Sequence, residues 1–212
     1  MCGIVGLFCK TETHRHELGR LTAVMLREMR DRGPDSAGFA SYDAGLPDRT
    51  RITVLAEGIT VDWGPVAAAL EGVLGAEVTV RAVHDHVVFS TGGDGRAARQ
   101  WIIDNVAGAT VLSYGAQIEL YKAVGDPDLV AERYDLASRT GTHALAHTRM
   151  ATESAVAILR DPIACKPAVV AETDDWVAMS SEYRAIARLP GAADAEVWEP
   201  EPARIYTWSL AA

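Results

Sequence analysis

The sequence has little of several features that would narrow its function at once. No apolar run is long enough to span a membrane, no stretch is basic, and the formal net charge is −9, so we expect neither a membrane nor a nucleic acid as a partner. There are three cysteines, Cys2, Cys9 and Cys165, which do not make an even set for a disulfide framework. With no secretory signal in front of Cys2, this predicts a reducing, cytoplasmic location.

Signatures of metals and cofactors are equally sparse. The histidines of HRH (14–16) and HDH (84–86) have no cysteine or carboxylate cluster beside them that would complete a metal site. The segment STGGDGRAA (90–98) precedes an expected helix but lacks the spacing and the lysine of a phosphate-binding loop, so it predicts a turn and a helix cap. We therefore expect no metal and no cofactor.

What the sequence does contain is enough apolar material, 49% of its residues, for a substantial core. We expect one α+β domain over 1–212, strand-rich in its outer parts, with an α+β subdomain inserted at about 60–125. Apolar spacing predicts a helix over 16–32, and AGFASYD and TRITVLAE are predicted to be the two strands of a hairpin around GLPD. The expected N-caps of three further helices are Asp62, Asp94 and Asp126.

Cys2 is the residue with the most distinctive chemistry. An initiator methionine is commonly removed when a small residue follows it, and removal of Met1 would leave Cys2 at the amino terminus. The α-amine, with an ordinary pKa of about 8, could then act as the base that activates the thiol of the same residue. The alternative is a small buried residue in a first strand, because free cysteine is among the most buried residue types.

Two further motifs could contribute to a site. AHTRMAT (146–152) offers Arg149, whose planar guanidinium suits a carboxylate, with Thr148 and Thr152 as hydroxyl donors. RDRGPDSAG (30–38) combines two glycines and a proline, which permits a tight loop. Taken alone, the arginine is typical of a solvated strand end, and the loop is typical of an ordinary turn from a helix to a strand.

The order of these motifs resembles that of the class II glutamine amidotransferases, which are N-terminal-nucleophile hydrolases. CGIVG, RGPDSAG and HTRMAT carry the resemblance, and the later DDWVAMSSEYRAI looks like a further part of the family pattern. The resemblance covers 1–42 and about 140–212, and it is closest to the stand-alone amidotransferase subunits of glutamate-synthase-like enzymes, including N-methylglutamate synthase. It implies a four-layer αββα sandwich.

The resemblance also implies a role for each candidate residue. Cys2 would be the catalytic nucleophile that attacks the side-chain amide of glutamine. Arg149 would bind the α-carboxylate of the substrate, with Thr152 beside it, and the loop around 32–38 would pack next to the nucleophile. The reaction would pass through a γ-glutamyl thioester and release glutamate, with the ammonia going to a synthase partner subunit.

One block of the family pattern is missing. In the family, an Asn-His-Asn-Gly strand that forms the oxyanion hole follows soon after the HTR strand, and an acidic residue that binds the substrate α-amine comes later. Here 152–161 runs directly into what resembles a much later strand, and the one asparagine, Asn105, lies in an expected helix. Two alternatives to a glutaminase stay open: a non-catalytic interaction subunit of a glutamate-synthase-like complex, and an N-terminal-nucleophile hydrolase of another amide.

Overall fold

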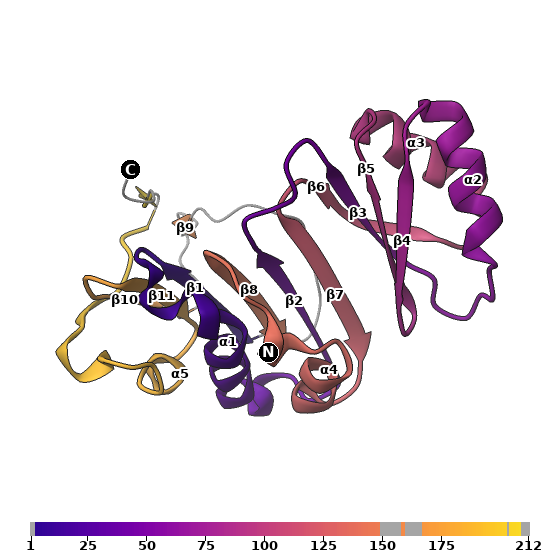
Figure 1. Cartoon of the computed structure of the whole chain (residues 1–212). Helices are drawn as coiled ribbons and strands as arrows, with labels where there is room; N and C mark the ends of the chain where they lie inside the picture. The colour runs from indigo at the N-terminus through magenta and orange to yellow at the C-terminus, as the bar shows by residue number, and fades with distance from the viewer. Residues whose placement is uncertain (1–2, 149–157, 160–166, 203, 209–212) are drawn as a thin grey trace. The chain divides into compact units, whose positions relative to one another are not determined.

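The computed structural model describes residues 3–148, 158–159, 167–202 and 204–208 (Figure 1). Helices and antiparallel strands alternate irregularly along the chain, which confirms the predicted α+β class, while the four-layer arrangement stays a prediction. The chain divides into two compact units, the first made of Met1–Ser41 with Lys122–Ala212 and the second of Tyr42–Tyr121. Within the described ranges, no helix has the length and apolar character needed to cross a membrane.

The first unit is built on a seven-stranded sheet in the order β12-β10-β11-β1-β8-β2-β7. Its strands are β1 (Gly3–Cys9), β2 (Ser36–Tyr42), β7 (Ile118–Val124), β8 (His143–Thr148), β10 (Val169–Glu172), β11 (Trp176–Ser180) and β12 (Glu196–Trp198). In the middle of the sheet, β1 pairs antiparallel with β8 on one side and with β11 on the other. Both partners come from the last third of the chain, so the fold brings the first strand and the late motifs together (Figure 1).

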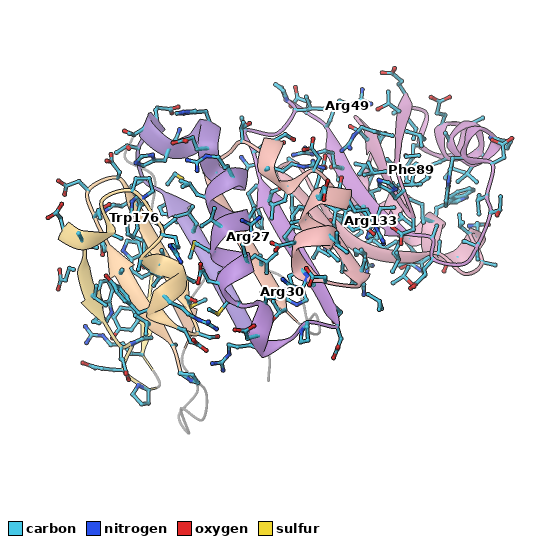
Figure 2. All side chains as sticks on the ribbon, turned by 90° about the horizontal axis from the view of Figure 1, so that it is seen from below. Arg27, Arg30, Arg49, Phe89, Arg133 and Trp176 are labelled. Atoms are coloured by element: carbon cyan, nitrogen blue, oxygen red, sulfur yellow. The ribbon has the colours of Figure 1, made fainter. Side chains whose placement is uncertain are left out.

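Helices and short 3-10 segments complete the first unit: η1 (Glu12–Glu17), α1 (Leu18–Glu28), η2 (Arg30–Arg32), α4 (Pro127–Arg133), η3 (Leu136–Ser138), α5 (Tyr183–Ile186) and η4 (Ala192–Asp194). The helix predicted over 16–32 is confirmed in its middle part as α1, with 3-10 segments at either end, and its apolar residues at helical spacing, Leu18, Leu21 and Met25, are buried. This helix packs on β1 and β8, and it also contacts α4, α5 and η3. From α1 and η2, Arg27 and Arg30 extend to the start of α4, where they form ion pairs of 2.9 Å with Asp128 and 2.6 Å with Asp126 (Figure 2).

The second unit contains a four-stranded sheet in the order β4-β5-β3-β6 and two helices. Its elements are β3 (Thr50–Leu55), α2 (Trp63–Leu74), β4 (Val78–Val83), β5 (His86–Thr91), α3 (Gly95–Asn105) and β6 (Thr110–Gly115). A single core between sheet and helices includes Ile52, Leu70, Phe89 and Ile102. This compact unit begins before residue 60 because β3 belongs to it; the expected range of the insertion, about 60–125, stays a prediction.

The three predicted helix caps are confirmed. Asp62 accepts a hydrogen bond from the backbone N of Gly64, Asp94 from those of Arg96 and Ala97, and Asp126 from that of Asp128. Each carboxylate satisfies a backbone N–H that has no partner inside its helix.

The hairpin predicted for AGFASYD and TRITVLAE is wrong. These segments form β2 and β3, which lie in different sheets, and β3 pairs instead with β5 and β6. The strand β3 is buried from Arg51 to Val54, so it needs a partner on each edge, and a hairpin with β2 would supply only one. Near the carboxyl end, the short strand β13 (Ile205–Tyr206) pairs only with β9 (Ile158–Leu159) among the described residues.

Candidate functional site

The three predicted site residues, Cys2, Arg149 and Thr152, lie outside the described residues, and their placement stays a prediction. The structure does place the sequence neighbours of the first two. Gly3 follows Cys2, Thr148 precedes Arg149, and the two are register partners at the ends of β1 and β8. Strand pairing therefore brings Gly3 of the amino-terminal motif and Thr148 of the HTR motif together at one end of these two central strands.

A buried hydrogen-bond chain fixes this pairing. The backbone N of Gly3 donates to Thr148 Oγ1 at 3.0 Å, and Thr148 Oγ1 donates to the carbonyl oxygen of Met29 at 3.3 Å. Thr148 is completely buried. We expected its hydroxyl to serve a ligand, and that expectation is wrong: the side chain faces the helical layer, where its hydroxyl joins β1, β8 and the end of α1.

Gly3 is required where β1 passes the end of α1. A Cβ atom on Gly3 would lie 2.7 Å from Met29 Cβ, closer than real Cβ contacts, and 3.0 Å from Thr148 Oγ1, which is tighter than most of them. A larger residue would push β1 away from the end of α1. Close packing against Met29 and Thr148 therefore explains why a glycine follows Cys2 in the motif CGIVG.

The turn after β11 holds the other edge of β1. The backbone N of Ile4 donates to Ser181 Oγ at 3.1 Å, and the backbone N of Ser181 donates to the carbonyl oxygen of Ile4 at 3.0 Å. One residue later, Glu182 forms an ion pair with Arg32 of the RGPDS loop, with 2.7 Å between Oε1 and Nη1. The hydrogen bond from Arg32 is the main reason why the pKa of Glu182 lies below its usual range, so this carboxylate is ionised at neutral pH.

Two histidines of β8, His143 and His147, lie on the face of the strand opposite to the buried Thr148. Burial lowers the pKa of His143 to about 4, and its Nδ1 lies 2.9 Å from Thr142 Oγ1. Burial is also the main cause of the lowered pKa of His147, whose Nδ1 has no hydrogen-bond partner among the described residues. Both rings are therefore neutral at pH 7, and His147 lies across from Ile4 in the strand register.

The other polar motifs of the sequence have structural roles. His86 of HDH is buried, with its Nδ1 2.8 Å from Asp85 and its ring 5.3 Å from that of Tyr121. Asp94 of STGGDGRAA caps α3, as the turn-and-cap prediction requires. Asn105 ends that helix and donates to the carbonyl oxygen of Trp101 at 2.8 Å, so it does not belong to an oxyanion strand. In the described part of the chain, no three His, Cys, Asp or Glu side chains gather in a way that could hold a metal ion.

A polar surface pocket of about 590 Å³ lies at the other end of β1. Its walls include Lys10, Glu172 and Trp176. Because Lys10 follows the last residue of β1 and Gly3 is the first, the pocket is separated from the Gly3–Thr148 edge by the length of the strand. It is therefore not part of the candidate site.

Sequence reasoning missed the contacts that hold the site's edge. Nothing in the sequence distinguishes Met29, whose carbonyl oxygen accepts the hydrogen bond from Thr148 and whose side chain lies next to Gly3. The pairing of Arg32 with Glu182 was also missed, although RGPDS and SSE were both noticed as parts of one family pattern. Only the family pattern itself, in which both segments recur, offered a signal that they meet.

Comparison with known proteins gives two informative relatives, and no family model matches the chain. The chain is 32% identical to a glutamine amidotransferase-like protein, GlxB, from Rhizobium meliloti (strain 1021), over 98% of each protein. It is 33% identical to a putative glutamine amidotransferase from Methanothermobacter thermautotrophicus, over 74% of this chain and 54% of that protein.

The length of the first alignment is itself informative. It extends over 298 positions, whereas the chain has 212 residues, so at least 86 positions (298 less 212) have no residue of this chain opposite them. A relative that matches nearly end to end therefore contains a considerable amount of sequence that is absent here. With 32% identity over almost the full length of both proteins, the chain belongs to the family of glutamine amidotransferase-like proteins.

Proposed function

We propose that this protein is a glutamine amidotransferase subunit of the N-terminal-nucleophile class, which acts in the cytoplasm and passes ammonia to a synthase partner. The names of the two relatives support glutamine as the substrate. The observation that carries the proposal is the pairing of Gly3 with Thr148. Paired Cα atoms lie about 5 Å apart and successive ones about 3.8 Å, so covalent geometry keeps the Cα atoms of Cys2 and Arg149 within about 13 Å of each other.

In the proposed reaction, the α-amine of Cys2 takes the thiol proton and the thiolate attacks the amide carbon of glutamine. The new S–C bond places the carbonyl electron pair on oxygen, and as this intermediate collapses the C–N bond breaks and the leaving nitrogen takes the proton, giving ammonia. Water then cleaves the γ-glutamyl thioester to glutamate and restores the thiol. Arg149 would hold the α-carboxylate through two parallel hydrogen bonds, with Thr152 as a further donor, and no step needs a metal or a cofactor.

The proposed rate is low. Negative charge develops on the amide oxygen, and removing one donor from an oxyanion hole costs about 10² to 10³ in turnover. The family's Asn-Gly strand has no counterpart in the sequence, and Asn105 bonds within its own helix. The unmatched positions of the first alignment favour, as a second candidate, a non-catalytic subunit that binds a synthase partner.

The deciding experiment measures ammonia release by the purified chain from glutamine, asparagine and a set of other primary amides, alone and with added synthase subunits. A Cys2→Ser variant is the matched control. Release from glutamine that Cys2→Ser abolishes supports the proposal. No release from any amide, combined with stable binding to a synthase subunit, supports the non-catalytic candidate, and preferential release from another amide supports a hydrolase of that amide.

A further inference from the structure

The strand β4 forms one edge of the second sheet, and among the described residues it pairs with β5 alone (Figure 1). A two-residue turn joins the two strands, so Val83 and His86, which flank the turn, exchange the first ladder hydrogen bonds. Because bonding alternates along an antiparallel strand, Val83 and every second residue before it direct their backbone groups to β5. The backbone groups of Ala82 and Val80 therefore point away from the sheet.

The hydrogen bonding of Val78 agrees with this alternation. Its backbone N, which also points outward, donates to the carboxylate of Glu71 on α2 at 2.8 Å. The outward groups of Val80 and Ala82 have no such partner in the part of the chain that the structure describes. Ala82 is exposed and Val80 is partly exposed. The edge thus offers two N–H donors and two carbonyl acceptors at the spacing that another extended segment needs for pairing.

The sequence does not protect this edge. Proteins usually protect exposed edges with prolines, lysines, bulges or very short strands, whereas β4 reads VTVRAV, which is rich in residues that favour strands and has one charge. Other edges among the described residues differ: β12 has three residues, β7 contains Glu119 and Lys122, and the pairing of β6 with β3 is irregular between Thr53 and Val54. The edge at β4 is therefore the one best suited to accept a further strand.

Arg81 gives this edge a preference for negative charge. The hydrogen bonds of its guanidinium all use Nη2, which bonds the two oxygens of Glu119 at 2.8 and 2.7 Å and the hydroxyl of Tyr121 at 3.4 Å. Nε and Nη1 form no hydrogen bond within the described ranges, and the side chain is 49% exposed. A side chain directly opposite Arg81 on an added strand would lie next to it, so a carboxylate there could accept from the remaining donors.

The side chains of Val80 and Ala82 lie on the other face of β4, because successive side chains of a strand alternate. Val80 packs there against the core between the sheet and its helices. Apolar residues opposite these two on an added strand would extend this apolar row.

We propose that the β4 edge binds an extended segment of a partner protein in antiparallel pairing. The segment has an acidic residue opposite Arg81 and apolar residues opposite Val80 and Ala82, so main-chain hydrogen bonds provide affinity and these three side chains provide selectivity. A second copy of this chain fits less well, because pairing β4 with itself through the same outward groups places the two copies of Arg81 directly opposite each other.

The test uses the full chain and a fluorophore-labelled, amidated peptide of sequence TTVEVTT, with binding followed by anisotropy. One peptide variant is methylated on the backbone nitrogens of both valines, whose N–H groups would bond β4. Its matched control is methylated on the nitrogen of the glutamate, whose N–H would point away, and a third variant has lysine in place of the glutamate. In the protein, Ala82→Pro removes one outward donor at an edge position where proline is tolerated, and Ala82→Ser is its matched control.

We expect the parent peptide and its glutamate-methylated form to bind alike, and methylation of both valines to abolish binding. The lysine peptide should bind about fivefold more weakly, because a like charge then lies opposite Arg81. Ala82→Pro should weaken binding of the parent peptide about fivefold, whereas Ala82→Ser should leave it unchanged. In the complex, hydrogen exchange should slow at the backbone N–H groups of Val80 and Ala82.

Absence of binding by the parent peptide up to about 1 mM would overturn the proposal. Equal binding of the peptide methylated on both valines would do so as well, and this comparison does not depend on how well Ala82→Pro folds. A lysine peptide that binds as tightly as the parent would contradict the acidic preference. A dimer of the chain alone, seen by sedimentation and dissociated by Ala82→Pro, would identify a second copy as the occupant and overturn the proposal.

Discussion

Gly3 and Thr148 face each other across β1 and β8, and the backbone N of Gly3 donates to Thr148 Oγ1 at 3.0 Å in the interior of the first unit. A threonine hydroxyl thus takes the place of a ladder carbonyl where β1 begins and β8 ends. One side-chain oxygen therefore contributes to the stability of this strand pairing.

We predict that Thr148→Val lowers the free energy of unfolding by about 1 to 3 kcal/mol, because it leaves the buried N–H of Gly3 without its acceptor. Thr148→Ser keeps the hydroxyl and loses only a methyl group, so it should cost about 1 kcal/mol. Urea denaturation of both variants measures the difference. No loss in Thr148→Val, which keeps the volume of the side chain, would show that the hydroxyl contributes nothing.

Two helical glycines should respond in opposite directions to alanine. A Cβ on Gly19 would lie 1.9 Å from the carbonyl oxygen of Leu136, whereas one on Gly72 would meet nothing within 4 Å. Gly19→Ala should therefore separate α1 from η3 and cost about 1 to 3 kcal/mol. Gly72→Ala should stabilise α2 by about 0.5 to 1 kcal/mol. Thermal melts of the two variants test the close approach of α1 to η3, and a neutral Gly19→Ala would contradict it.

Acid should destabilise the first unit through His143. Its folded-state pKa is about 4 against an ordinary 6.5, so between these values the unfolded chain binds the proton and the folded chain does not. Stability that is fully present above pH 6.5 is therefore lost as the pH falls toward 4. In His143→Phe the urea midpoint should depend less steeply on pH over this range, with a smaller slope left from His147. An unchanged slope would rule out His143 as a source.

Removal of Met1 should be essential for activity. While Met1 is attached, the nitrogen of Cys2 is part of a peptide bond and cannot act as a base. With an ordinary pKa of about 8.5, the thiol then stays mostly protonated at neutral pH. Mass spectrometry of the intact chain identifies the two forms, and labelling by a chloroketone analogue of glutamine compares them. Equal labelling rates would mean that another group activates the thiol.

Supplying the missing block should restore turnover. A family-derived segment that contains the Asn-Gly strand, grafted between Thr152 and Ile158, should raise ammonia release by at least about two orders of magnitude. A graft in which Asn and Gly are replaced by Ala and Val controls for improved folding. Full activity in the ungrafted chain would mean that other groups provide the oxyanion donors, and the backbone amides near Gly33 would be the first to examine.

The elements that the sequence predicted well are those that depend on local interactions. Asp62, Asp94 and Asp126 cap helices because each bonds a backbone N–H two or three residues away, and the buried stripe of α1 follows from its apolar spacing. Such features are encoded within a few residues. Their prediction therefore does not require knowledge of distant contacts.

Strand pairing was harder to predict because its partners are distant. A turn motif between β2 and β3 suggested a hairpin, but two edges of β3 are filled by β5 and β6. The same holds for the candidate site, where neither Arg32 nor Glu182 shows its partner in its own neighbourhood. Residue types identified the candidate chemistry, while the contacts that hold it depend on loops closing over more than a hundred residues.

The central place of β1 in its sheet also has a consequence during translation. The ribosome makes this apolar strand well before its two partners, β8 and β11, which begin only at His143 and Trp176. At about 5 to 20 residues per second, roughly 7 to 28 s pass before the first partner is made. Over that interval the nascent amino end has neither neighbour, so a processing peptidase can act on it, and a chaperone that binds extended apolar segments can protect it from aggregation.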